Sequence, residues 1–251
     1  MPASAFLLGA SAAVRVASLN LCTDEYLLLL GRPEQIASVS YLSHDPLESP
    51  LWRQARAFRA NRGSIEDVLT LRPTLLLTMG GGGRASALLA SRLHIRSIDL
   101  PYATNLAGVE DNLRTVAAAL GDQRRADSQV RRLEQLRRSA PPRARDAIWI
   151  SGRGDSLAPG SLGAHWLRLA GLQQRALPGG RATLETLLAN PPNTLVRSDY
   201  RLNQMSTGTR WLDHPFVRRA GAHRLVTDGR RWTCMGPLMI DEIARLRAMV
   251  R

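Results

Sequence analysis

Apolar residues along the first hundred positions occur in short runs, and each run ends at glycine, proline or a polar cluster. Residues 14–20 alternate and are rich in β-branched side chains, which predicts a first strand. Similar runs predict three further strands, at residues 35–41, 74–79 and 94–100. Helices are predicted between them, at residues 25–30 and 84–92. Strands that alternate with helices pair in parallel, so this pattern predicts an α/β fold with helices on both faces of a sheet.

The middle of the chain is predicted to be helical, over residues 106–120 and then 122–139. In the second stretch the apolar positions follow the helical period and form one stripe, which consists of Ala126, Val130, Leu133 and Leu136. The opposite face is mostly arginine. We therefore expect a two-faced helix that packs on one side and joins two α/β blocks.

A second α/β block follows this helix. The pattern predicts strands at 147–151 and 223–227 and helices at 164–170 and 237–250. The predicted division of the chain is an N-terminal lobe over 14–121, a connecting helix over 122–139 and a C-terminal lobe over 140–251.

One segment of the chain occurs twice. Residues 64–77 read SIEDVLTLRPTLLL and residues 183–196 read TLETLLANPPNTLV, so Glu66 aligns with Glu185. Each copy predicts a short capped helix, a proline that ends it and a buried parallel strand. The two glutamates lie in the first turn of their helices, where an acid complements the helix dipole. They are equally compatible with two docking points for a symmetric partner.

The charge of the chain is strongly positive, with a formal net charge of +13 and 34 basic residues that are all arginine. The arginines are spread along the chain and aromatic residues make up only 5%. Nucleic-acid-binding proteins instead gather basic charge on one face and interleave aromatic side chains. A nucleic-acid-binding protein is therefore the less favoured alternative, and we expect no nucleic-acid partner.

The first residues resemble an export signal. Residues 5–13 are small and apolar, and Ala10-Ser11-Ala12 is similar to a signal-peptide cleavage pattern, although no basic segment precedes it. Residues 1–13 are therefore predicted to be the remnant of a signal peptide. No other stretch approaches the ~20 apolar residues that span a bilayer.

Motifs for catalysis are missing from the sequence. The glycine-rich loop at 152–161 has neither the Walker lysine nor the dinucleotide-binding fingerprint, no G-x-S-x-G elbow occurs, and the five histidines are isolated. Cys22 and Cys234 are compatible with a disulfide, two buried thiols or ligand contacts, and the first two are favoured over a metal site. The sequence predicts a binding protein with no catalytic residue, no resident cofactor and no metal site.

Several short motifs, in this order, resemble one family. They are SLNLCTDEYLL (18–28), the repeated segment, AAALG (117–121), APGSL (158–162), LRLAG (167–171), DHPF (213–216) and WTCMGP (232–237). The family is the periplasmic substrate-binding proteins of ABC importers for iron–siderophore complexes, haem and cobalamin. Thr74 and Asn193 replace an acid that is usual in the family, and Met235 replaces a glycine.

The resemblance implies two Rossmann-like lobes, each with a parallel sheet flanked by helices, joined by one long backbone helix. It implies a monomer in the periplasm that captures a metal chelate, either a ferric siderophore or cobalamin, with haem as the alternative. It also implies that Glu66 and Glu185 form salt bridges with arginines of a dimeric ABC permease. Loops at the carboxyl ends of strands are then expected to line the ligand cleft, with contacts from Cys22, Thr23, Tyr41, Gly81, Arg84, Tyr102, Arg153, Tyr200, Trp232 and Met235.

Overall fold

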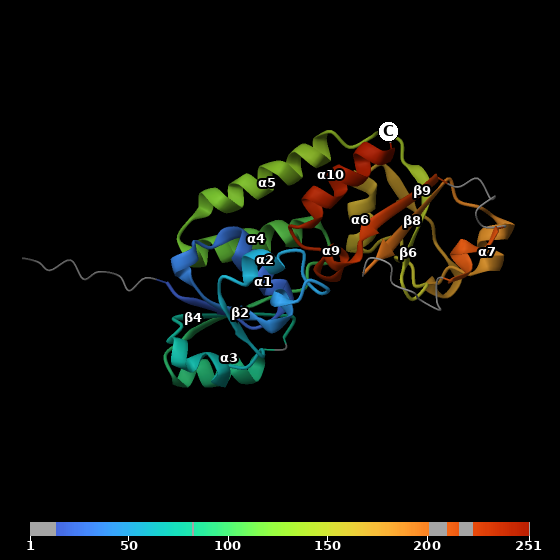
Figure 1. Cartoon of the computed structure of the whole chain (residues 1–251). Coiled ribbons are helices and arrows are strands. Elements are labelled where there is room, and N and C mark those ends of the chain that lie inside the picture. The colour runs from blue at the N-terminus through green and yellow to red at the C-terminus, as the bar shows by residue number, and fades with distance from the viewer. Residues whose placement is uncertain (1–13, 82, 201–209, 216–222, 251) are drawn as a thin grey trace, which may run out of the picture.

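The computed structural model describes residues 14–81, 83–200, 210–215 and 223–250 and consists of two α/β lobes (Figure 1). The predicted signal-peptide remnant, residues 1–13, lies outside the described residues. Each lobe contains its own parallel sheet, as the strand and helix pattern predicts. The prediction of a two-lobe α/β fold is confirmed.

The N-terminal lobe contains five parallel strands in the order β3-β2-β1-β4-β5. The strands are β1 (Val16–Ser18), β2 (Ile36–Ser40), β3 (Arg59–Asn61), β4 (Leu75–Met79) and β5 (Arg96–Leu100). The helices around them are α1 (Leu21–Leu30), α2 (Trp52–Ala55), α3 (Arg84–Arg92) and α4 (Leu106–Leu120), with 3₁₀ turns η1 (Pro33–Gln35), η2 (Tyr41–His44) and η3 (Glu66–Leu71). The central strands β1 and β4 are buried along their whole length, because helices cover both faces of the sheet.

The C-terminal lobe contains four parallel strands in the order β7-β6-β8-β9. The strands are β6 (Arg145–Ser151), β7 (Leu172–Gln174), β8 (Thr194–Asp199) and β9 (His223–Asp228). The helices around them are α6 (Leu162–Leu169), α7 (Leu184–Ala189), α9 (Gly229–Cys234) and α10 (Met239–Val250), with 3₁₀ turns η4 (Pro178–Gly180) and η5 (Arg210–Asp213).

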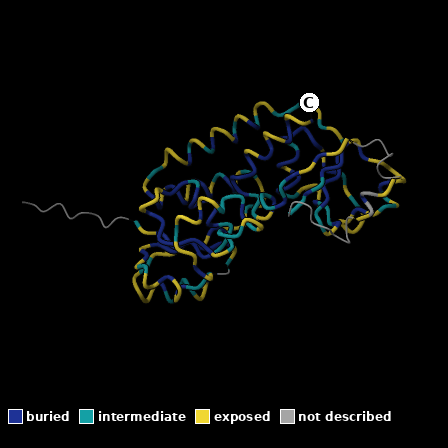
Figure 2. Tube along the Cα trace, viewed as in Figure 1, coloured by how far each residue is buried: buried dark blue, intermediate teal, exposed yellow. Residues whose placement is uncertain are grey.

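The helix α5 (Gln123–Arg138) lies within the predicted connector and runs along both lobes (Figure 1). All four residues of its predicted apolar stripe are buried. They belong to one apolar cluster that extends from Val16 in the first lobe to Trp166 and Ile243 in the second. Buried positions continue through the region where the lobes meet, while the outer turns of α5 are exposed (Figure 2). The lobes therefore share a core beneath α5, which joins them more firmly than a loop would.

Several elements differ from the sequence prediction, and the first copy of the repeat forms the 3₁₀ turn η3, in which the N-cap residue makes no side-chain cap hydrogen bond. The edge strands β3 and β7 are only three residues long, too short for a periodic pattern to reveal them. The helix α1 begins at Leu21 rather than Glu25, because the Asn20 side chain accepts a hydrogen bond from the Thr23 amide at 2.9 Å and caps the helix earlier.

Candidate ligand cleft

A cleft of about 460 Å³ opens between the two lobes. Its walls lie at the carboxyl ends of β1, β4, β5 and β8, which is where ligands bind in open α/β sheets. Another hollow, of about 400 Å³ between α5 and α10, contains no strand end in its wall. The residues that line the cleft are Leu19, Asn20, Leu21, Cys22, Leu42, Glu48, Gly63, Thr78, Met79, Gly83, Ser86 and Tyr102 from the N-terminal lobe, and Tyr200 and Thr233 from the C-terminal lobe.

The chemistry of this lining is aromatic, hydroxylic and aliphatic. Tyr102 lines the cleft and is 68% exposed, so this residue is accessible to a ligand. The one carboxylate among the described lining residues is Glu48, and those residues include no arginine or histidine. Such a surface favours stacking and neutral hydrogen bonds over the capture of an anion.

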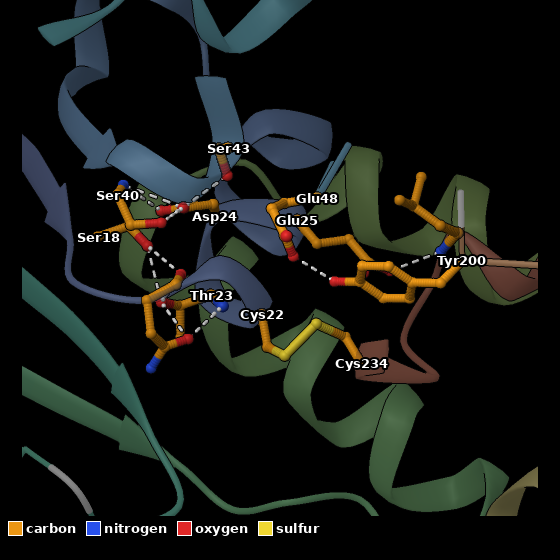
Figure 3. Close-up of a disulfide and its surroundings, with 12 residues drawn as sticks. Ser18, Cys22, Thr23, Asp24, Glu25, Ser40, Ser43, Glu48, Tyr200 and Cys234 are labelled. Carbon is orange, nitrogen blue, oxygen red and sulfur yellow. Dashed lines mark hydrogen bonds between the residues drawn. A yellow bond between two sulfur atoms is a disulfide. The ribbon is translucent and has the colours of Figure 1, made fainter. Parts of the chain in front are cut away.

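Glu48 and Tyr200 connect the lobes across the cleft. The Tyr200 hydroxyl donates a hydrogen bond to the Glu48 carboxylate (Figure 3). Beside them, the Arg230 guanidinium donates to the Pro46 carbonyl at 2.5 Å and is itself paired with Asp228. The loop over residues 46–48 of one lobe is therefore held by two side chains of the other.

The two cysteines form a disulfide between Cys22, at the start of α1, and Cys234, at the end of α9 (Figure 3). Their Cα atoms are 5.3 Å apart although 212 positions separate them in sequence. This decides among the alternatives that the sequence left open. Cys22 does line the cleft, but as half of a disulfide it presents no thiolate to a ligand.

Two adjacent buried acids support this wall of the cleft. The Asp24 carboxylate accepts hydrogen bonds from the Ser40 hydroxyl at 2.5 Å and from the Ser43 hydroxyl at 2.6 Å. Glu25 accepts one from the Leu238 amide of the other lobe at 2.7 Å. Burial raises the pKa of each carboxyl to about 7, against the hydrogen bonds that favour the charged form.

Residues 16–151 match the family model described as periplasmic binding protein. The chain belongs to this family. No curated protein matches the sequence. The family resemblance that the motifs predicted is therefore confirmed over more than half of the chain.

Solved structures of periplasmic binding proteins share the fold. A periplasmic haem-binding protein of Vibrio cholerae has 16% identity and a TM-score of 0.72, covering 95% of this chain and 99% of that chain. A periplasmic haem-binding protein from Pseudomonas aeruginosa has 21% identity and a TM-score of 0.64, covering 93% and 91%. The periplasmic vitamin B12-binding protein of Vibrio cholerae has 19% identity and a TM-score of 0.62, covering 94% and 96%. At these identities the likeness shows the fold alone.

No helix in the described part of this periplasmic binding protein combines the length and apolarity that crossing a membrane requires. The described residues likewise contain no cluster of three or more side chains suited to holding a metal ion.

Two predicted cleft residues are instead buried behind its wall. Thr23 is fully buried, and its hydroxyl bonds to the Ser18 hydroxyl at 2.7 Å. Trp232 is buried too, with its indole N–H donating to the Thr227 hydroxyl at 2.7 Å and its ring against Trp149. Neither side chain reaches the cleft surface in this structure, and ligand contact stays a prediction for both. A position near a strand end gives the neighbourhood of a side chain, whereas the turn of α1 or α9 decides which way it points.

The other predicted ligand contacts have mixed outcomes. Tyr102 and Tyr200 line the cleft with Cys22, whereas the remaining five predicted residues lie outside its described lining. Met235 closes α9 in a left-handed conformation with φ of 49°, a conformation that glycine adopts more readily than methionine. Ligand contact stays a prediction for all five, Tyr41, Gly81, Arg84, Arg153 and Met235.

Sequence reasoning missed Glu48, Thr78, Ser86 and Thr233 as lining residues. Thr78 could have been predicted from the sequence, because it lies one residue before the end of the predicted strand at 74–79. Glu48 gives no such signal, because it lies in a loop between Pro46 and Pro50 whose course depends on the opposite lobe.

The two matched glutamates, Glu66 and Glu185, are exposed in the first turns of η3 and α7. The Thr183 hydroxyl caps α7 by accepting a bond from the Thr186 amide at 3.2 Å. The pKa of Glu185 is lowered by its own backbone amide and then by the Thr183 hydroxyl. Both carboxylates are therefore available to a partner, while their role as docking points stays a prediction.

Proposed function

We propose that this protein is the periplasmic solute-binding component of an ABC importer, which captures a metal chelate between its lobes and delivers it to a permease. Membership of the periplasmic binding protein family supports the general role. The single observation that carries the substrate class is the cleft at the carboxyl edges of both sheets. A solute-binding family has no need of catalytic residues, and we assign no enzymatic activity.

Within this class we favour cobalamin. Its corrin ring carries amide side chains and no carboxylates, so it can stack on tyrosine and form hydrogen bonds with Thr78, Ser86 and Thr233. A ferric siderophore with net negative charge would meet Glu48 without a compensating cation from the described lining. The Glu48 carboxylate in the lining is what separates the two ligand classes here.

Haem is the second candidate because one observation favours it. Tyr102 presents a largely exposed phenol to the cleft, and a tyrosine oxygen can ligate haem iron. Glu48 disfavours haem, because its carboxylate would repel the two propionates unless they point out of the cleft.

Calorimetric titration of the purified protein with cyanocobalamin, haemin and a panel of ferric siderophores tests this proposal. We expect cyanocobalamin to bind with a Kd of about 1 μM or below, and haemin at least about tenfold more weakly. Tighter binding of haemin would assign the haem alternative. Saturable binding of none of these ligands would overturn the chelate-binding function.

Glu48→Gln sharpens the test, because glutamine still accepts the Tyr200 hydrogen bond but carries no charge. We expect this variant to bind haemin about tenfold more tightly and cyanocobalamin within about twofold of wild type. Equal changes for both ligands would show that Glu48 does not discriminate by charge. Tyr102→Phe separates the alternatives further, since only haem ligation requires the phenol oxygen.

Delivery to a permease forms the second half of the proposal. Glu66 and Glu185 are exposed, matched in sequence and carried on equivalent crossovers of the two lobes. Such a pair suits two cationic pockets of a dimeric membrane protein. A Glu66→Ala, Glu185→Ala variant that binds its ligand but supports normal uptake would contradict this role.

A further inference from the structure

The two copies of the repeat expose a leucine at the same position. Leu69 lies three residues after Glu66 and is 37% exposed, while Leu188 lies three residues after Glu185 and is 43% exposed. The residue before each leucine, Val68 or Leu187, is buried in the core of its lobe. Core packing therefore accounts for Val68 and Leu187, while Leu69 and Leu188 remain partly exposed to solvent.

Both leucines are carried on equivalent crossovers. β4 follows η3 and pairs with β1, the first strand of its lobe, while β8 follows α7 and pairs with β6, the first strand of the other lobe. A crossover that returns between parallel strands begins at their carboxyl edge. The segment that contains each glutamate and leucine thus starts on the cleft side of its sheet.

Contacts in each lobe agree with this placement. Gly63, three residues before Glu66, lines the cleft itself. In the other lobe, the Ala182 amide donates to the Gly154 carbonyl at 3.1 Å, and Gly154 belongs to the loop that leaves the carboxyl end of β6. Each Glu-x-x-Leu pair therefore follows a segment at the carboxyl edge of its own sheet, one pair on each lobe.

We propose that Leu69 and Leu188 are apolar anchors of the docking face, each entering a small apolar depression beside the cation that receives the neighbouring glutamate. The partner is the two-fold symmetric permease of the proposed function, on which this inference rests. Two equivalent pairs in one chain match a two-fold partner, and carboxylates on a chain with net charge +13 give the contact its orientation. The desolvated leucines supply the affinity.

The test measures docking and ligand binding separately. The permease–ATPase complex of the source organism is reconstituted in nanodiscs, and binding of the full chain is followed by biolayer interferometry. We expect Leu69→Ser, Leu188→Ser to weaken docking about tenfold or more while the Kd for cyanocobalamin stays within about twofold. Each single variant is expected to show a smaller, similar loss.

The matched control is Leu93→Ser, Met249→Ser, which also removes one exposed apolar residue from each lobe. Leu93 is 44% exposed just after α3, and Met249 is 41% exposed near the end of α10. Neither belongs to the repeat, and we expect docking of this variant to equal that of wild type. Docking of the Leu69→Ser, Leu188→Ser protein at wild-type strength, or an equal loss in the control, would overturn the inference.

Two further outcomes distinguish a failure of the proposed function from a failure of this inference. Wild-type protein that docks but binds no chelate would count against the proposed substrate and leave the leucines to be judged by docking. Sedimentation of wild-type protein as a dimer that dissociates in the leucine variant would assign these residues to self-association and would overturn the permease contact.

Discussion

The interior of the N-terminal lobe and the contact between the lobes are built differently, and adjacent acids on α1 show how. Asp24 points into its own lobe, where the Ser40 amide and the hydroxyls of Ser40 and Ser43 all donate to it. Glu25 points to the other lobe and accepts one backbone bond, from Leu238. The lobe interior satisfies its buried acid fully, whereas the interlobe contact uses fewer hydrogen bonds and adds a covalent link.

We name the interlobe seam by its pairs: Cys22–Cys234, Glu25–Leu238, Glu48–Tyr200 and Pro46–Arg230. Three of the four are polar contacts, and hydrogen bonds within a domain contribute only about 1 kcal/mol each. The disulfide is therefore the strongest single constraint on how the lobes sit. The seam should respond most to reduction and the lobe interior most to loss of Asp24.

The largest expected effect is that of removing the disulfide. Cys22→Ser, Cys234→Ser should lower the free energy of unfolding by about 4 kcal/mol, because the link closes a loop of nearly the whole chain. Urea unfolding followed by circular dichroism measures this loss. We also expect the single transition to broaden or split as the lobes become less coupled.

Reductant supplies the control for this variant. The described residues contain no free cysteine, so dithiothreitol should destabilise wild-type protein by the same amount and leave the serine variant unchanged. A wild-type protein that is indifferent to reductant would contradict the role of the disulfide in the seam.

The second effect, about 3 kcal/mol, is expected inside the lobe. Asp24→Ala removes the acceptor of three buried donors, and leaving such donors without a partner costs free energy. Asp24→Asn retains one side-chain oxygen and should cost about half as much. If alanine costs no more than asparagine, the serine hydroxyls find other acceptors and the lobe interior is less specific than its geometry indicates.

The sequence predicted the features that depend on local interactions and missed those that depend on contacts between distant segments. The bounds of α4 and the buried stripe of α5 were predicted correctly, because helical periodicity is a local property that 15 or more residues repeat. The repeated segment predicted β8 and the cap of α7, because these features also depend on residues close together in sequence. The second copy also revealed the pairing of glutamates that no single motif would show.

The seam could not be predicted in this way. The pairing of Cys22 with Cys234 depends on how α1 meets α9, and the two helices lie at opposite ends of the chain. Thr23 and Trp232 were predicted as ligand contacts because loops at strand ends were expected to line the cleft, yet both side chains are buried. Glu48 was missed because its role arises only when Tyr200 of the other lobe is beside it.

The smallest effect expected is a change in pH dependence at the seam. Burial raises the pKa of Glu25 from 4.5 to about 7, so the folded chain keeps a proton that the unfolded chain releases. The stability from this proton is complete below pH 4.5 and is lost as pH rises through about 7. Glu25→Gln should therefore reduce the fall in unfolding free energy between about pH 5 and pH 8 by about 2 kcal/mol.

Urea unfolding of wild type and Glu25→Gln at both ends of this pH range checks the prediction. Asp24→Asn is the comparison, since burial raises the pKa of Asp24 to about 7 as well and its removal should flatten the profile by a similar amount. Of these two acids, only Glu25 bonds to the other lobe. Its protonation, unlike that of Asp24, should therefore alter how strongly reductant destabilises the protein. Parallel pH profiles for wild type and Glu25→Gln would show that Arg231 holds Glu25 ionised, and the seam would then be a charged contact rather than a neutral one.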